Sequence, residues 1–139
     1  MFLTIKDYKA VVDNKTLGVI NQSDPENLER AEGYAIDEIS SYLRSRYDVA
    51  KAFSETESNR NRQLVMYTCD VALYHLIAWM PQRIGFEIRE IRYKRAIEWL
   101  ESVQAGKASP DLPLLTDDSG NDIGNPVKWG SWGKNTYDY

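Results

Sequence analysis

Three stretches of the chain repeat apolar residues at intervals of three and four positions, the spacing that places side chains along one face of an α-helix. The first predicted helix spans about residues 25–47. It starts at Ser23-Asp24-Pro25-Glu26, which offers a capping oxygen, a proline for the first turn and an acidic residue near the positive helix end. Its apolar face consists of Leu28, Ala31, Ala35, Ile39, Tyr42 and Leu43, whereas Glu29, Glu32, Asp37 and Arg44 lie off that face.

Two more long helices are predicted, at about residues 61–80 and 86–104. The earlier one is apolar on most sides, so we expect it at the centre of the fold. Met80-Pro81 ends it, because a residue before proline disfavours helical angles, and Gly106 is a suitable C-cap for the later helix. The apolar positions are Leu64, Val65, Tyr67, Val71, Leu73, Tyr74, Leu76, Ile77 and Trp79 in one helix, and Ile88, Ile91, Ala96, Ile97, Trp99, Leu100 and Val103 in the other.

Two shorter helices precede these. Thr4 and Asp7 have the spacing of a helix cap, which predicts a helix over about residues 5–12, and a second helical turn is expected at about 17–20. The segment 54–61 has no apolar residue and is expected to be an exposed loop. The predicted fold is therefore all-α, a small helical bundle of two short N-terminal helices and three longer ones.

The pattern changes after Gly106, where prolines, glycines, acidic residues and late aromatic residues replace the helical spacing. We therefore predict a helical domain at 1–106 and an extended C-terminal arm at 107–139. A small β-hairpin centred on Ser119-Gly120-Asn121 is compatible with the residues around it. Ordering each residue costs about 1–2 kcal/mol, more than the apolar side chains of the arm can return on one small domain, so a partner surface is expected.

Composition narrows the function classes only moderately. The chain has 139 residues, 42% hydrophobic and 27% charged, as expected of one globular domain. Its net charge of −4 argues against a general nucleic-acid coat protein. No secretory signal or membrane span is evident, and Cys69 is the sole cysteine, so we expect a soluble protein made in a reducing cytoplasm, without disulfides.

The search for reaction chemistry is negative. Cys69 and His75 are six residues apart, which puts them on opposite sides of the predicted helix, so we expect a structural histidine. Asp117, Asp118 and Asp122 lack the terminal glutamate of a calcium loop, and no phosphate-binding glycine loop is present. We predict no catalytic residues, no cofactor and no metal.

A run of positive charge marks the last long helix, with Arg89, Arg92 and Arg95 spaced three residues apart. Acidic residues interleave with it, and Glu90 to Lys94 is a favourable four-residue pair. This alternation favours a solvated or subunit-facing surface. Binding of DNA phosphates by the three arginines remains the alternative.

Several stretches resemble the Mu-like head-completion or adaptor proteins, a family of phage head-to-tail connector proteins. The resemblance spans about residues 1–113. It is carried by Phe2-Leu3-Thr4 with Asp7-Tyr8, Ala35-Ile36 with Ser41-Tyr42-Leu43-Arg44-Ser45-Arg46-Tyr47-Asp48, Tyr74-His75-Leu76 with Pro81-Gln82-Arg83, and Ile91-Arg92-Tyr93 with Ala96, Trp99-Leu100 and Val103-Gln104-Ala105-Gly106.

The resemblance implies a non-enzymatic virion protein at the neck, between head and tail. Such subunits form a homo-oligomeric ring, commonly a dodecamer, beneath the portal protein; the ring extends the DNA channel without sequence-specific binding and docks the next neck or tail protein. Implied contacts between ring neighbours are Arg44, Arg46, Asp48, Arg89, Glu90 and Arg92, and implied anchors on the portal or a neighbour are Trp129, Trp132, Tyr137 and Tyr139. A tail terminator or stopper ring, a DNA-binding regulatory module and a small enzyme using His75 are the alternatives.

Overall fold

The computed structural model describes residues 1–20, 24–78, 85–117, 119–121 and 123, and over these ranges the protein is all-α, with no strand. The prediction of two short N-terminal helices and three longer ones is confirmed, and one further short helix is present. The helices are α1 (Ile5–Lys9), α2 (Asn14–Ile20), α3 (Pro25–Leu43), α4 (Val49–Ser54), α5 (Arg62–Ile77) and α6 (Phe86–Gln104), with a 3-10 turn η1 (Glu57–Asn59) before α5.

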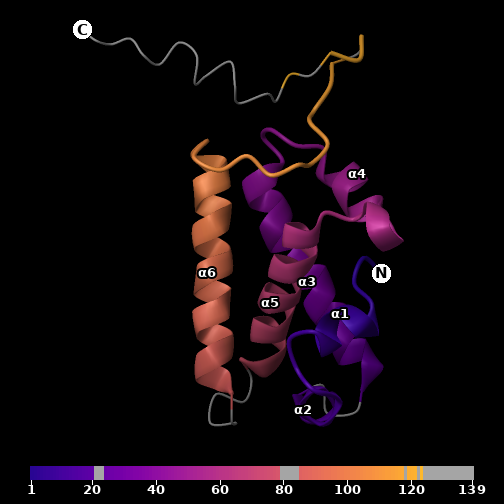
Figure 1. Ribbon diagram of the computed structural model, residues 1–139, viewed down its shortest axis with the longest axis vertical. Helices are drawn as coiled ribbons and strands as arrows, with labels where there is room; N and C mark the ends of the chain where they lie inside the picture. Colours follow the sequence, from indigo (N-terminus) through magenta and orange to yellow (C-terminus); the bar gives the residue numbers. More distant parts are fainter. Residues whose placement is uncertain (21–23, 79–84, 118, 122, 124–139) are drawn as a thin grey trace, which may run out of the picture.

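The body consists of α3, α5 and α6, with α5 packed against both of the others. Figure 1 shows that α3 and α6 run in the same direction and that α5 runs opposite to them, while α1 and α2 lie beside the lower half of α5 and α3. Leu64, Val71, Leu73 and Ile77 of α5 are completely buried. The expectation that this helix is central is confirmed. Within the described ranges, no helix is both long and apolar enough to cross a membrane.

The start of α3 is as predicted, but its end is not. The Asp24 side chain accepts the N–H of Glu26 at 3.0 Å, and the proline at position 25 begins the helix. The prediction that the helix continues to residue 47 is wrong, because it ends at Leu43 and the chain turns so that Tyr47 packs inside, 2% exposed. Asp48 then caps α4 by accepting the N–H of Lys51 at 3.1 Å.

The short N-terminal helices also differ in their bounds. α1 ends at Lys9 instead of residue 12, and α2 starts at Asn14 because the Asp13 side chain accepts the N–H of Thr16 at 2.8 Å. The predicted cap of α1 is confirmed, since the Thr4 and Asp7 side chains each accept the other's backbone N–H. The helical turn expected at 17–20 is therefore the second half of a longer helix.

α6 has the predicted bounds, but its first half does not face the way its apolar residues indicate. Arg89 is buried, 7% exposed, whereas Ile88 and Ile91 are 47% and 61% exposed. The predicted apolar stripe is therefore wrong at its first two positions. From Ala96 to Val103 the helix follows the prediction, with those two side chains fully buried.

The first residues of the predicted arm pack on the body. Gly106 follows α6 with a left-handed φ of 81°, as its predicted place at the helix end requires, and Leu112 is 8% exposed. The chain also turns back on itself where a hairpin was considered, with the N–H of Asp117 donating to Asn121 and the N–H of Ile123 donating to Leu115, both at 2.8 Å. Whether residues 1–106 and 107–139 form separate units stays a prediction.

Candidate interaction surfaces

The sole histidine lies where the three long helices meet. His75 on α5 places its Nε2 atom 2.7 Å from Oε1 of Glu38 on α3, and the hydroxyl of Tyr93 on α6 donates to the other carboxylate oxygen at 2.6 Å. Burial and the nearby Glu38 raise the pKa of Tyr93, which keeps its proton on the hydroxyl. Cys69 is 1% exposed, and burial raises the pKa of its thiol. His75 therefore contacts Glu38, and the Cys69 thiol lies shielded in the core.

A second polar contact joins α5 to α6. Asp70 is completely buried, and its Oδ1 atom lies 2.7 Å from Nε of Arg92. Burial raises the pKa of Asp70, and the hydrogen bond from Arg92 lowers it again in part. Arg89, one turn earlier on α6, donates to the backbone carbonyl of Val11 at 3.4 Å, and burial lowers the pKa of its guanidinium. These two arginines, implied as contacts with ring neighbours, thus bind within their own chain, while Glu90 beside them is half-exposed.

The remaining residues implied for ring contacts lie after α3. Arg44 is exposed, and its Nε donates to the carbonyl of Ser40 at 3.2 Å. Arg46 reaches the end of α6, where its guanidinium donates to the carbonyls of Val103 at 2.9 Å and Gln104 at 3.5 Å. A cation suits a helix C-terminus because unpaired carbonyls point outward there. Arg46 therefore joins the ends of two helices.

The start of the arm is bound by the backbone of the segment after α3. The N–H of Asp48 donates to the carbonyl of Pro113 at 2.8 Å, and the N–H of Leu115 donates to the carbonyl of Arg46 at 3.1 Å. Asn61, which caps α5, also donates through its side chain to the carbonyl of Asp111 at 3.0 Å. The described part of the arm thus crosses the bundle from the C-terminal end of α6 and leaves the body from one fixed place, beside the segment between α3 and α4 (Figure 1). The implied anchors Trp129, Trp132, Tyr137 and Tyr139 lie outside the described residues.

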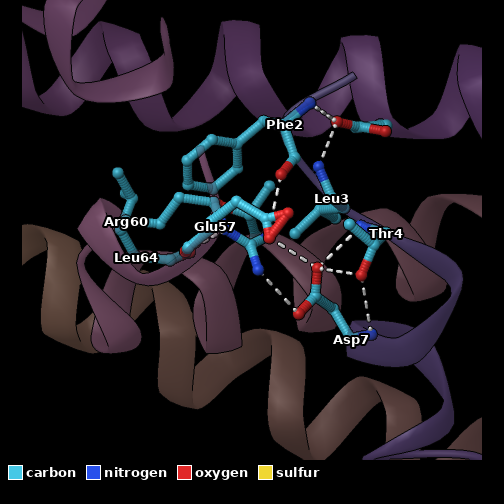
Figure 2. A network of polar contacts seen from close by, with 9 residues as sticks. Phe2, Leu3, Thr4, Asp7, Glu57, Arg60 and Leu64 are labelled. Carbon is cyan, nitrogen blue, oxygen red and sulfur yellow. Dashed lines mark hydrogen bonds and ion pairs between the residues drawn. The ribbon is translucent and has the colours of Figure 1, made fainter. Parts of the chain in front are cut away.

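The N-terminal segment is held by charged side chains (Figure 2). Oε2 of Glu32 accepts the N–H groups of Phe2 at 2.8 Å and Leu3 at 2.9 Å. Burial raises the pKa of Glu32, and these two N–H groups lower it in part. Glu32 is 2% exposed, so its position off the predicted apolar face does not make it a surface residue. Its role was missed because the groups it binds are distant in sequence.

Arg60 is the second support of this segment. Its Nη1 donates to the carbonyl of Phe2 at 2.9 Å and to Oδ2 of Asp7 at 2.6 Å, and its Nε donates to the carbonyl of Glu57 at 3.1 Å. Burial raises the pKa of Asp7, but the hydrogen bonds from Arg60 and Thr4 prevail, so the pKa lies below its ordinary value. Glu57, whose carbonyl accepts the bond from Arg60 Nε, has an uncommon φ of 54° (Figure 2). The segment 54–61 is largely exposed, as predicted, but it is not simply a loop: Ser54 ends α4, Glu57–Asn59 form the 3-10 turn η1, and Arg60 lies mostly buried in this support.

Comparison with known proteins gives the chain a family. A search of curated proteins finds none that matches it. A family model described as "Bacteriophage Mu, Gp36" matches residues 3–124, which include all the helices and the bound start of the arm. Within the described ranges, no group of three or more His, Cys, Asp or Glu residues is arranged to hold a metal ion. The match indicates a phage-associated protein with a role in phage structure or morphogenesis, and the chain belongs to the bacteriophage Mu Gp36 family.

Proposed function

We propose that this protein is a structural head-to-tail connector of the virion. Copies of the chain form a ring, a dodecamer by resemblance, beneath the portal protein; the ring extends the DNA channel and docks the next neck or tail component. The observation that carries the proposal is the attachment of residues 111–115 to the helical body, which fixes where the C-terminal arm leaves it. Membership of a bacteriophage Mu family supports it.

The arm suits docking because its start and its end differ in chemistry. Residues 111–115 are bound to the body by main-chain hydrogen bonds and by the buried Leu112. The remaining segment, 124–139, contains two tryptophans and two tyrosines. These residue types are enriched at the centres of protein interfaces. A segment that leaves from a fixed point can present such anchors to the portal or to a neighbouring subunit at a defined distance from the ring.

The charged residues implied for ring contacts divide into two groups. Arg44 is exposed and Glu90 is half-exposed, so both can meet a neighbouring subunit directly. Arg46, Asp48, Arg89 and Arg92 bind groups of their own chain and would act by positioning these surfaces. Opposite charges repeated around a ring fix the orientation of neighbours more than they add affinity.

Passage of DNA requires a channel that does not grip phosphates. Arg89 and Arg92 point into the bundle, where they bind the Val11 carbonyl and Asp70, so they do not form the exposed basic row that their spacing indicated. The net charge of −4 adds no general attraction to DNA. Both observations support a channel subunit over the DNA-binding regulatory module.

The test is co-sedimentation with the portal ring of the same phage. The full-length chain is compared with a chain that ends at residue 123, which keeps the bound start of the arm, and with the Trp129→Ala, Trp132→Ala double variant. We expect at least about tenfold weaker binding for both altered chains, with unchanged helical circular dichroism. Ile123→Ala, an exposed residue of the described arm, is the control and should bind as the full-length chain does.

Two other outcomes would change the proposal. Undiminished binding by the shortened chain would show that the arm is not the docking device. If the full-length chain fails to bind the portal and instead binds a later neck component, the protein is a stopper or tail terminator.

A further inference from the structure

The first half of α6 exposes two isoleucines and buries an arginine. Ile88 and Ile91 lie one turn apart and are 47% and 61% exposed, whereas Arg89 is 7% exposed. Single apolar residues on a surface need no explanation, but a buried charge beside an exposed apolar pair on one helix does. The outer surface formed by Ile88 and Ile91 is called the isoleucine surface below.

Contacts on the inner side hold this orientation in place. Arg92 pairs with the completely buried Asp70 at 2.7 Å, and Arg89 donates to the carbonyl of Val11. A rotation of α6 that buried the isoleucines would break both contacts and leave the Asp70 carboxylate buried without a partner, at a high free-energy cost. The polar contacts therefore keep the isoleucine surface toward solvent.

The outer face of α3 offers a second exposed surface, at Gly33 and Tyr34. Gly33 lies in the middle of this helix, where glycine destabilises the helix relative to alanine. Among the described residues, no heavy atom beyond its own helix lies within 4 Å of a Cβ placed there, so packing within the chain does not require glycine. Tyr34 beside it is 53% exposed. A glycine next to an exposed aromatic ring suits close approach of a side chain from another molecule.

The charges around the two surfaces are opposite. On α3, the exposed Glu29 and Asp37 lie one turn before and one turn after Gly33. On α6, the exposed Lys94 and Arg95 follow Ile91 by one turn. Glu87 and Glu98 on α6 and Arg30 on α3 also carry charge, so the contrast is confined to Lys94 and Arg95 on one surface and Glu29 and Asp37 on the other. Such pairing steers two molecules into one arrangement.

The two surfaces also lie at the same level of the bundle. α3 and α6 run in the same direction, and the Tyr93 hydroxyl donates to the Glu38 carboxylate, so residues 93 and 38 lie at about the same height along the bundle. Gly33 precedes Glu38 by five positions, and Ile88 precedes Tyr93 by five positions. With an equal rise per residue, Gly33 and Ile88 are level on the outer sides of the two helices. A rotation about an axis along the helices brings one surface against the other without a shift.

We propose that the isoleucine surface of one copy packs on the Gly33–Tyr34 surface of the next copy. The contact is head-to-tail, because each copy offers both surfaces, and a contact of this kind closes into a ring when the rotation between copies divides a full turn. This inference rests on the proposed ring and names the helix faces that would form it. In this arrangement, Ile88 and Ile91 make the main contact between copies, in place of Arg89 and Arg92, which the family resemblance implied.

The first test measures self-association of the full chain by sedimentation velocity over a range of concentrations. Ile91→Asp should weaken association at least about tenfold, because it buries an unpaired charge in the contact. Ile123→Asp introduces the same charge at another residue that is 61% exposed and should leave association unchanged. Equal association of both variants and the wild type would overturn the proposed surface but not the ring.

A glycine variant separates assembly from folding. Gly33→Gln introduces a better helix former, so the melting temperature should stay the same or rise. Association should nonetheless fall, because the side chain occupies the approach to Tyr34. Unchanged association would show that nothing packs at Gly33 and would overturn the proposal.

Cross-linking decides which surfaces meet. Copies carrying Ile91→Cys are mixed with copies carrying Tyr34→Cys under a mild oxidant; the natural Cys69 is 1% exposed and remains unreactive. Disulfides between unlike copies support the head-to-tail contact. Disulfides only between Ile91→Cys copies would indicate a two-fold contact and overturn the proposal. A chain that stays monomeric at every concentration would also overturn it.

A different result would assign the isoleucine surface to the portal: loss of portal binding by Ile91→Asp with unchanged self-association. The separate portal test of the arm would still stand.

Discussion

The two ends of the described chain are both bound to the body, but by different kinds of bond. Residues 2–3 are held by side chains: the Glu32 carboxylate accepts their N–H groups and Arg60 donates to the Phe2 carbonyl. Residues 111–115 are held mainly by main-chain hydrogen bonds to the segment after α3. The N-terminal attachment thus depends on which side chains are present and on their ionisation, whereas the C-terminal attachment depends on backbone geometry.

The largest expected effect comes from the side-chain support. Arg60→Ala removes the partner of Asp7 and the donor to the Phe2 carbonyl, and both groups lie at a largely buried place, where the arginine and aspartate side chains are 13% and 14% exposed. We expect a loss of about 3 kcal/mol in the free energy of unfolding, measured by urea denaturation. Arg62→Ala, an exposed neighbour, should change it by less than about 0.5 kcal/mol. Equal effects would show that Arg60 does not support the N-terminal segment.

A proline tests the backbone attachment. Leu115→Pro removes the N–H that donates to Arg46, and we expect a loss of about 2 kcal/mol together with faster amide exchange at Asp48. Leu115→Ala keeps that N–H and serves as the control, with a loss of about 1 kcal/mol or less because the side chain is half-buried. A proline variant no worse than the alanine variant would contradict the comparison.

The smallest expected effect comes from removing the ionisation of Glu32. The folded state raises the pKa of Glu32 above its ordinary value, so the stability that this group contributes is complete below that value and is lost as the pH rises through the folded pKa. Glu32→Gln keeps an acceptor oxygen and should change the free energy of unfolding by less than about 1 kcal/mol at pH 7. Relative to wild type, the variant should gain stability as the pH rises from 4 to 7.

Asp7 provides an internal control in the same pH titration, because its ionisation changes the free energy of unfolding in the opposite direction. The pKa of Asp7 lies below its ordinary value in the folded state, so the stability it contributes is present above that value and is lost as the pH falls through the folded pKa. Glu32→Gln should not change this loss of stability at acid pH. A variant whose pH dependence matches wild type throughout would show that Glu32 is not the group responsible.

Local signals in the sequence located the long helices. Asp24 and Pro25 start α3 and Gly106 ends α6 as predicted, and Gly85, which also has a positive φ, precedes the first residue of α6. α4 was missed because six residues with one cap carry no periodicity of their own, and tertiary packing supplies most of the stability of so short a helix. The extension of α3 to residue 47 failed for a related reason, since the burial of Tyr47 ends the helix.

Local sequence patterns could not predict the polar contacts, because the partners are far apart in the chain. Asp7 and Arg60 are 53 residues apart, and Glu32 is 30 residues from Phe2. A capping pattern revealed Asp7 but not its second partner. The reversal in α6 had no local signal either, because Ile88 and Arg89 are neighbours and their orientation depends on distant partners, the Val11 carbonyl for Arg89 and the buried Asp70 for Arg92.

Arg46 also determines how the molecule would carry a mechanical load. Its backbone accepts the N–H of Leu115, and its guanidinium holds the last carbonyls of α6. Tension on the arm would therefore reach the bundle first through the hydrogen bond between Leu115 and Arg46, and Arg46 would pass part of it to the C-terminal end of α6.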